Sequence, residues 1–176
     1  MAGYVLAGGR SSRMGRDKAQ LPWNGGTLLD HVVDTVKTAL GDVTRIGAGY
    51  DLPDILPDHG PLGGLWSALA HTHCNWVLIT ACDMPNLTPE FLRDLAHAAS
   101  ASPAGAVVPD INGRLHPLCA AYHCRLLPAA EAAVRRNSLK MHDFLSTVQV
   151  ERWPVADPAL LANLNTPEEL SAWRAR

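Results

Sequence analysis

A continuous apolar run at residues 76–80 constrains the fold more than any other part of the sequence. The run reads Trp-Val-Leu-Ile-Thr and shows no alternation of apolar and polar residues. A strand of this kind is typical of a parallel sheet whose two faces are both covered by helices. Cys82 and Asp83 follow almost at once, so we expect them at the end of this strand. We therefore predict an α/β protein with residues 76–80 in a central strand.

Other strand-like runs and helix-like periods alternate along the chain. We expect strands near residues 4–7, 43–48, 106–108, 118–122 and 148–155, and helices near residues 27–39, 61–72, 88–100, 126–135, 140–146 and from 166 onward. Thr27 and Thr88 stand at N-cap positions, and Gly41 follows the first helix. Such alternation predicts right-handed crossovers and a Rossmann-like, three-layer open sheet, mostly parallel, with helices on both faces. In such sheets, ligands bind at the carboxyl ends of the strands.

Length, composition and charge limit the number of domains and the kinds of partner to be expected. With 176 residues, of which 47% are hydrophobic and 18% charged, we expect one domain spanning residues 1–176. The formal net charge is -2 and the basic residues are scattered, so neither nucleic acid nor a membrane surface is an expected partner. No apolar run approaches the roughly 20 residues that span a bilayer, and no signal-peptide pattern opens the sequence. We therefore expect a cytoplasmic protein.

Residues 6–18 leave the end of the first expected strand as a glycine-rich and strongly basic segment. The segment reads Leu-Ala-Gly-Gly-Arg-Ser-Ser-Arg-Met-Gly-Arg-Asp-Lys. Small residues let backbone amides approach oxygen atoms closely, and the basic side chains offer positive charge. Phosphate is therefore the expected ligand. A solvated surface loop is also compatible with this composition. The spacing fits neither a Walker A loop nor the dinucleotide fingerprint.

Asp83 is expected at the same edge of the sheet as this segment, because parallel strands end there together. A carboxylate oxygen suits Mg²⁺, which needs only one or two protein carboxylates when phosphate oxygens complete its coordination. An aspartate before Met84 and Pro85 could equally cap a turn. The residues around Asp83 do not by themselves separate the two interpretations.

Taken together, these segments resemble the signature of nucleotidyltransferases, and most closely that of the molybdenum cofactor guanylyltransferase (MobA) family. The resemblance is carried by Leu-Ala-Gly-Gly, Arg-Met-Gly and Asp-Lys within residues 6–18, and by Cys-Asp-Met-Pro at residues 82–85. Residues 60–64, Gly-Pro-Leu-Gly-Gly, and residues 163–168, Asn-Leu-Asn-Thr-Pro-Glu, are similar to two further family elements. Residues 114–118 resemble a family stretch leading into the acceptor-side strand.

The resemblance implies a role for particular residues of this chain. The residues matching the catalytic positions are Arg13, Lys18 and Asp83, of which Asp83 would hold the Mg²⁺ ion. The residues matching the nucleotide-binding positions are Leu6, Ala7, Gly8, Gly9, Lys18, Asp58 and Gly63. The residues matching the acceptor-binding positions are Asn163 and Asn165. No catalytic role is carried over to His116.

The reaction that the resemblance implies transfers GMP from GTP to molybdopterin. The terminal phosphate of molybdopterin would attack the α-phosphorus of Mg²⁺-bound GTP and release pyrophosphate. A phosphate monoester is already an anionic nucleophile, so the reaction requires alignment and charge neutralisation rather than a protein base. Arg13 and Lys18 would offset the charge of the α-phosphate and pyrophosphate. The resemblance also implies molybdoenzyme assembly proteins as partners that the chain contacts transiently.

One departure from the family pattern concerns the choice of base. The family's guanylyltransferases commonly carry an asparagine-bearing segment after the second strand, where this chain has Gly-Ala-Gly-Tyr at residues 47–50. A missing amide removes hydrogen bonds that select one base, so CTP is an alternative to GTP. A sugar phosphate or another phosphorylated acceptor, and a non-catalytic nucleotide-binding module, are further alternatives. A nicotinamide oxidoreductase would suit the sheet but not the glycine-rich segment.

Overall fold

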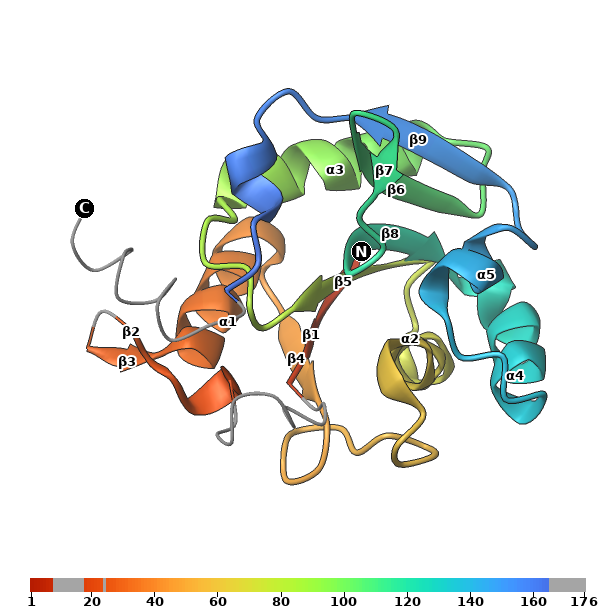
Figure 1. Ribbon diagram of the computed structural model, residues 1–176, viewed down its shortest axis with the longest axis horizontal. Coiled ribbons are helices and arrows are strands. Elements are labelled where there is room, and N and C mark those ends of the chain that lie inside the picture. Colours follow the sequence, from red (N-terminus) through yellow and green to blue (C-terminus); the bar gives the residue numbers. More distant parts are fainter. Residues whose placement is uncertain (8–17, 24, 165–176) are drawn as a thin grey trace.

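The computed structural model describes residues 1–7, 18–23 and 25–164, with only the backbone described at Lys18. Within these ranges the chain forms a seven-stranded sheet and a separate two-stranded hairpin (Figure 1). The strands of the large sheet are β1 (Ala2–Leu6), β4 (Val43–Ile46), β5 (Trp76–Ala81), β6 (Ala106–Ile111), β7 (Arg114–Leu115), β8 (Cys119–His123) and β9 (Val150–Pro154). Their order is β4-β1-β5-β8-β6-β7, and β9 pairs with β6.

The sheet is mixed but mostly parallel. β1 pairs in parallel with β4 and β5, and β6 pairs in parallel with β9. β8 lies between β5 and β6 and runs antiparallel to both, and β7 returns antiparallel to β6. The predicted α/β class with a mostly parallel sheet is confirmed, and the direction of β8 is the feature that the sequence pattern did not reveal.

Strand β5 lies in the middle of the sheet and is buried on both faces. Val77 and Ile79 belong to one apolar cluster, and Trp76 and Leu78 belong to another. Residues 77–80 are fully inaccessible to solvent. The continuous apolar run is therefore explained by two helical layers, because each face of the strand needs apolar side chains.

Helices cover both faces of the sheet (Figure 1). The helices are α1 (Leu28–Leu40), α2 (Gly60–His71), α3 (Pro89–Ala101), α4 (Leu127–Arg135) and α5 (Met141–Leu145). Helices α1 and α3 pack in the cluster that contains Leu78. Helices α2, α4 and α5 pack in the cluster that contains Val77 and Ile79. None of the helices in the described ranges has the length and apolarity required to cross a membrane.

Helix boundaries follow the capping residues of the sequence. Thr27 caps α1 by accepting a hydrogen bond from the Asp30 backbone, while the Asp30 carboxylate accepts one from the Thr27 backbone, which together make a capping box. Gly41 ends this helix with φ of 90°, a conformation that glycine adopts without strain. Thr88 caps α3 in the same way as Thr27 caps α1, through the Phe91 amide.

Replacing Thr27 by alanine is expected to lower the free energy of unfolding by about 1 kcal/mol, because the Asp30 amide loses its acceptor at the start of α1. Urea denaturation followed by circular dichroism measures this change. Thr38→Ala, on the same helix but away from its N-terminus, is the control and should change stability less. Equal losses in the two variants would contradict a capping role for Thr27.

Several short elements were not predicted. They are the hairpin of β2 (Pro22–Trp23) and β3 (Gly26–Thr27), strand β7, and the 3-10 helices η1 (Lys18–Gln20), η2 (Cys124–Leu126) and η3 (Pro158–Leu161). Strand β4 ends at Ile46 rather than residue 48, because Gly47 and Gly49 take positive φ values and turn the chain. The terminal helix expected from residue 166 lies outside the described residues.

Candidate active site

The carboxyl ends of β1 and β5 meet at one edge of the sheet, as the sequence predicted. Leu6 pairs with Ala81 in the parallel register, and the Leu6 carbonyl accepts a hydrogen bond from the Cys82 amide at 3.3 Å. On its other side, Ala7 donates its amide to Ile46 at 2.8 Å. The chain enters the glycine-rich segment directly after Ala7. Leu6, Ala7 and the end of β5 therefore share the edge where this segment begins.

Asp83 lies at this edge and is tied to Asn163, which is 80 positions away in the sequence. Asn163 Nδ2 donates a hydrogen bond to Asp83 Oδ1 at 3.2 Å. The Leu164 amide donates to the Asp83 carbonyl at 2.9 Å. Nearby, Asn86 Nδ2 donates to the Ala159 carbonyl at 2.8 Å and fixes the chain that approaches from η3. The residue expected to hold metal and a residue expected to face the acceptor are thus direct neighbours.

The first turns of α2 pack against the end of β1. A Cβ added at Gly64 would lie 2.7 Å from Leu6 Cδ2 and 3.7 Å from Asp54 Oδ1. A Cβ at Gly63 would lie 2.9 Å from His59 Cβ. The paired glycines therefore allow α2 to approach neighbouring atoms closely. This packing explains why a glycine is required at position 63. The contact of Gly63 with a nucleotide stays a prediction.

Asp58 and Asp54 occupy different environments in the loop before α2. Asp58 is exposed and has φ of 64°, in the left-handed region that aspartate tolerates better than most residues. Asp54 is half-buried, and burial raises the pKa of its carboxyl group. Within the described ranges, the Asp54 carboxylate has no hydrogen-bond or ion-pair partner. Asp54 thus lies beside the first turns of α2, near Gly64, and the sequence analysis did not single it out.

The segment at residues 47–50 places a tyrosine where the family's asparagine was expected. Gln20 Nε2 donates to the Tyr50 hydroxyl at 3.2 Å, which joins η1 to this loop. The Arg45 guanidinium lies 5.8 Å from the centre of the Tyr50 ring and pairs with Asp51 at 2.7 Å. Hydrogen bonds from the Arg45 side chain and amide lower the pKa of Asp51 to about 2. The loop is therefore held by ring and ion-pair contacts.

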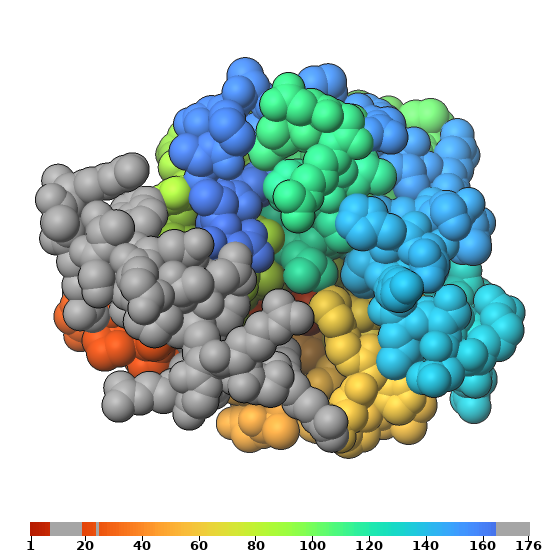
Figure 2. All heavy atoms as spheres, viewed as in Figure 1, coloured from red at the N-terminus to blue at the C-terminus, as the bar shows by residue number. Residues whose placement is uncertain are grey.

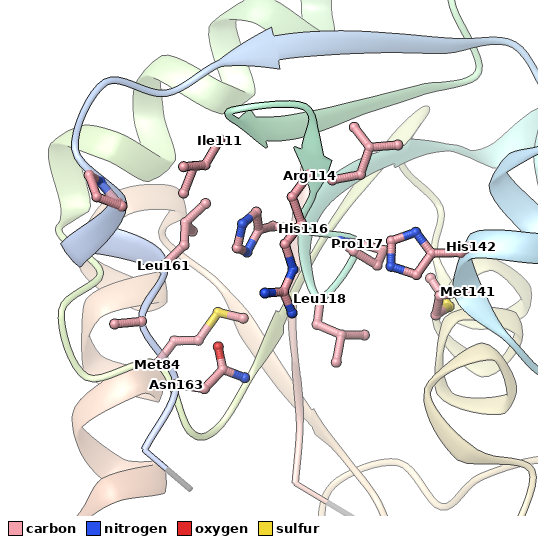
Figure 3. A pocket seen from close by; sticks show the side chains of 13 residues that line it. Met84, Ile111, Arg114, His116, Pro117, Leu118, Met141, His142, Leu161 and Asn163 are labelled. Atoms are coloured by element: carbon pink, nitrogen blue, oxygen red, sulfur yellow. The ribbon is translucent and has the colours of Figure 1, made fainter. Parts of the chain in front are cut away.

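A cavity of about 670 Å³ opens beside Asp83 on the same edge of the sheet. We call it the Arg114 cavity. Its walls are Met84, Ile111, Arg114, Leu115, His116, Pro117, Leu118, Met141, His142, Pro158, Leu161, Ala162 and Asn163 (Figure 3). The space-filling view shows this face hollowed between the green segment around β7, the blue segment around η3 and the lighter blue α5 (Figure 2). Through Met84 and Asn163, the cavity borders Asp83.

His116 lies in the wall of the Arg114 cavity, although the sequence analysis gave it no role. Burial lowers the pKa of His116, and the positive charge of Arg114 lowers it further. The imidazole is therefore mainly neutral at pH 7 and offers hydrogen bonds rather than charge. The signal in the sequence was the combination of Arg114 and His116 just before an apolar strand.

Several predicted site residues cannot be placed. Gly8, Gly9, Arg13 and Asn165 lie outside the described residues, and the Lys18 side chain is not described. The backbone at Lys18 begins η1, and Ala19 is fully buried in the apolar cluster that also contains Ala7. The roles given to these residues stay predictions.

Comparison with known proteins supports the resemblance. Residues 3–150 match the model of the MobA-like NTP transferase domain. A probable molybdenum cofactor guanylyltransferase of Bacillus cereus is 35% identical, covering 96% of this chain and 92% of that protein. The structure of molybdopterin-guanine dinucleotide biosynthesis protein A from Archaeoglobus fulgidus has a TM-score of 0.84 at 23% identity, covering 98% of this chain and 96% of that one. The Rv0371c protein of Mycobacterium tuberculosis, in complex with manganese, has a TM-score of 0.69 at 17% identity, covering 99% and 97%.

Proposed function

The chain belongs to the family of MobA-like NTP transferase domains, which are nucleotidyltransferases, and we propose that it transfers GMP from GTP to the phosphate of molybdopterin. In this reaction an oxygen of the acceptor phosphate forms a bond to the α-phosphorus, and the bond between the α-phosphorus and the bridging oxygen breaks. Pyrophosphate leaves with the electron pair of the broken bond. The observation that carries the proposal is the Asp83–Asn163 contact between the nucleotide edge and the Arg114 cavity.

Asp83 is the residue that would hold a divalent metal ion, for which we propose Mg²⁺. No group of three histidine, cysteine or acidic residues suited to a metal exists in the part of the chain that the structure describes. One carboxylate is sufficient when triphosphate oxygens and waters complete the coordination of Mg²⁺. The ion would neutralise charge on the phosphates. The Asn163 amide, by donating to Oδ1, would fix the orientation of the carboxylate.

The remaining residues would align two anions rather than move protons. An in-line displacement at phosphorus needs the attacking oxygen opposite the departing pyrophosphate. The glycine-rich segment, which starts at the end of β1, would hold the triphosphate on one side of Asp83. The Arg114 cavity, which borders Asp83 through Met84 and Asn163, would hold the acceptor. In this proposal both substrates would meet at one carboxylate.

Asp54 would read the guanine base. Guanine presents two neighbouring donors, the N1–H and the exocyclic amino group, whereas cytosine presents one amino donor beside an acceptor. A carboxylate accepts two such hydrogen bonds at once and repels the acceptor of cytosine. Asp54 is half-buried beside Gly64 and Leu6, where a base would lie against the first turns of α2. This carboxylate favours GTP despite the absence of the family's asparagine.

Asp54→Asn is expected to raise the Kd for GTP about 10- to 100-fold, because the new amide group meets the donors of guanine with a donor of its own. Fluorescence titration with a labelled GTP analogue and Mg²⁺ measures this constant. Asp58→Asn, four positions away in the same loop, is measured alongside. A loss of affinity in the Asp58 variant but not in the Asp54 variant would reverse the assignment and support the role that the sequence predicted for Asp58.

The test of the proposed function is a pyrophosphate-release screen over GTP, CTP, ATP and UTP, with and without molybdopterin, in Mg²⁺. We expect release only with GTP and molybdopterin together, and a product mass equal to their sum less pyrophosphate. Release with CTP and not with GTP, or, in a parallel series, release with a sugar phosphate and not with molybdopterin, would contradict the proposed substrates. Tight GTP binding without release under any condition would instead indicate a non-catalytic nucleotide-binding protein.

A further inference from the structure

Arg114 projects from β7 into the Arg114 cavity, and in Figure 3 its guanidinium group is directed toward the end where Met84 and Asn163 lie. The described residues of the wall are mostly apolar, and Arg114 is the sole arginine or lysine among them. These described wall residues include no aspartate or glutamate. Within the described residues, Arg114 forms no ion pair. The cavity thus offers a permanent positive charge that no carboxylate among its described wall residues neutralises.

The turn that carries Arg114 is held in place by contacts that occupy the Asp110 carboxylate. Arg152 Nε donates to Asp110 Oδ2 at 2.7 Å, and Arg152 Nη2 donates to the Gly113 carbonyl at 2.7 Å. The Gly113 amide donates to Asp110 Oδ1 at 2.7 Å. Hydrogen bonding by Arg152 lowers the pKa of Asp110, so this carboxylate is ionised and engaged at neutral pH. Asp110 therefore anchors the β6–β7 turn, and Arg114 is left to face the cavity.

The position of the cavity fixes which part of a ligand Arg114 would meet. Asn163 lines the cavity and donates a hydrogen bond to Asp83, and Met84 follows Asp83 directly. A group held by Arg114 at this end would thus lie beside the carboxylate where nucleotidyl transfer is proposed. Met141 and His142 of α5 form another part of the wall, away from Met84 and Asn163 in Figure 3. A cavity of this volume is suited to a small ring system.

We propose that Arg114 binds the phosphate of the acceptor and that the apolar part of the Arg114 cavity holds the ring system attached to it. This inference rests on the proposed function and extends it, because it names the residue that selects a phosphorylated, ring-bearing acceptor. A planar guanidinium group binds two phosphate oxygens through two parallel hydrogen bonds, which fixes orientation as well as position. His116 and His142 would add hydrogen bonds to the polar edge of the ring.

The experiment compares Arg114→Gln and Arg114→Lys with the wild-type protein in pyrophosphate release. We expect Arg114→Gln to raise the KM for molybdopterin about 10- to 100-fold, since a charge-assisted pair is lost. Arg114→Lys should show a large part of this loss, because lysine cannot make the paired hydrogen bonds. The KM for GTP should change less than about twofold, which separates acceptor binding from general damage to the fold. Arg93→Gln, at an exposed position on α3, is the matched control.

A second measurement keeps this inference separate from the proposed reaction. Isothermal titration calorimetry follows the binding of a pterin monophosphate, and of inorganic phosphate, to wild-type protein and Arg114→Gln without nucleotide. Weaker binding of the pterin monophosphate by the variant supports the inference, even if no GMP transfer to molybdopterin is detected. Equal binding by both proteins, or an unchanged KM for molybdopterin in an active variant, would overturn it. Weaker binding of phosphate but not of the pterin monophosphate would also overturn it, because Arg114 would then bind free phosphate and not the phosphate of a ring-bearing acceptor.

Discussion

Replacing Asp83 by asparagine is expected to lower the turnover number of nucleotidyl transfer about 100- to 1,000-fold, because the carboxylate that we propose as the ligand of the divalent ion is lost. Asparagine has nearly the same shape and keeps an oxygen that can accept the hydrogen bond from Asn163 Nδ2. The loss should therefore arise from chemistry and not from unfolding. Pyrophosphate release at saturating GTP and molybdopterin, over a series of Mg²⁺ concentrations, measures it.

The dependence on metal concentration distinguishes a metal ligand from a turn-capping residue. If Asp83 binds the ion, Asp83→Asn should need a higher Mg²⁺ concentration for half-maximal rate, and excess metal should restore part of the activity. Asp94→Asn, an exposed change on α3, is the control and should leave both quantities unchanged. A variant with near-normal turnover and an unaltered Mg²⁺ requirement would show that Asp83 only caps a turn. The proposed metal site would then be wrong.

The features predicted best from the sequence depend on local chemistry. Thr27, Thr88 and Gly41 mark helix ends because capping hydrogen bonds and positive φ values are set within a few residues. The run at residues 76–80 indicates burial on both faces, and this too can be read locally. The antiparallel course of β8 cannot, because an apolar strand has the same composition whichever way it runs. Its direction is decided by packing between segments that are distant in the sequence.

The candidate active site divides in a similar way. Asp83 was predicted because it follows a strand directly and matches a family element. Both residues were named from the sequence, but the contact between Asp83 and Asn163 was not predicted. The motif around each residue carries no information about how far apart the two lie in the fold. The partial burial of Asp54, on which its proposed role rests, was not predicted because it depends on α2 packing beside Leu6. The direction of Arg114 likewise depends on Arg152, which engages Asp110 from 42 positions away.

Removing the positive charge of Lys18 is also expected to lower turnover strongly, and a metal ion should not replace this charge. Lys18→Ala should lower turnover about 100-fold or more, because an ammonium group would no longer offset negative charge on the α-phosphate and the departing pyrophosphate. The backbone of Lys18 begins η1, and the buried Ala19 and the hydrogen bond from Gln20 to Tyr50 hold the next residues in place. The substitution should therefore leave the fold intact. Pyrophosphate release and the thermal unfolding midpoint together measure both expectations.

The two charge changes should respond differently to Mg²⁺. Raising its concentration should restore part of the activity of Asp83→Asn, because occupancy of a weakened metal site is concentration-dependent. The same increase should not restore Lys18→Ala, because the missing positive charge belongs to the protein and is placed at the phosphates independently of the ion. Lys37→Ala, an exposed change on α1, is the control and should be fully active. Restoration of Lys18→Ala by Mg²⁺ alone would show that lysine acts through the metal, and Arg13 would then be the residue to test for direct charge neutralisation.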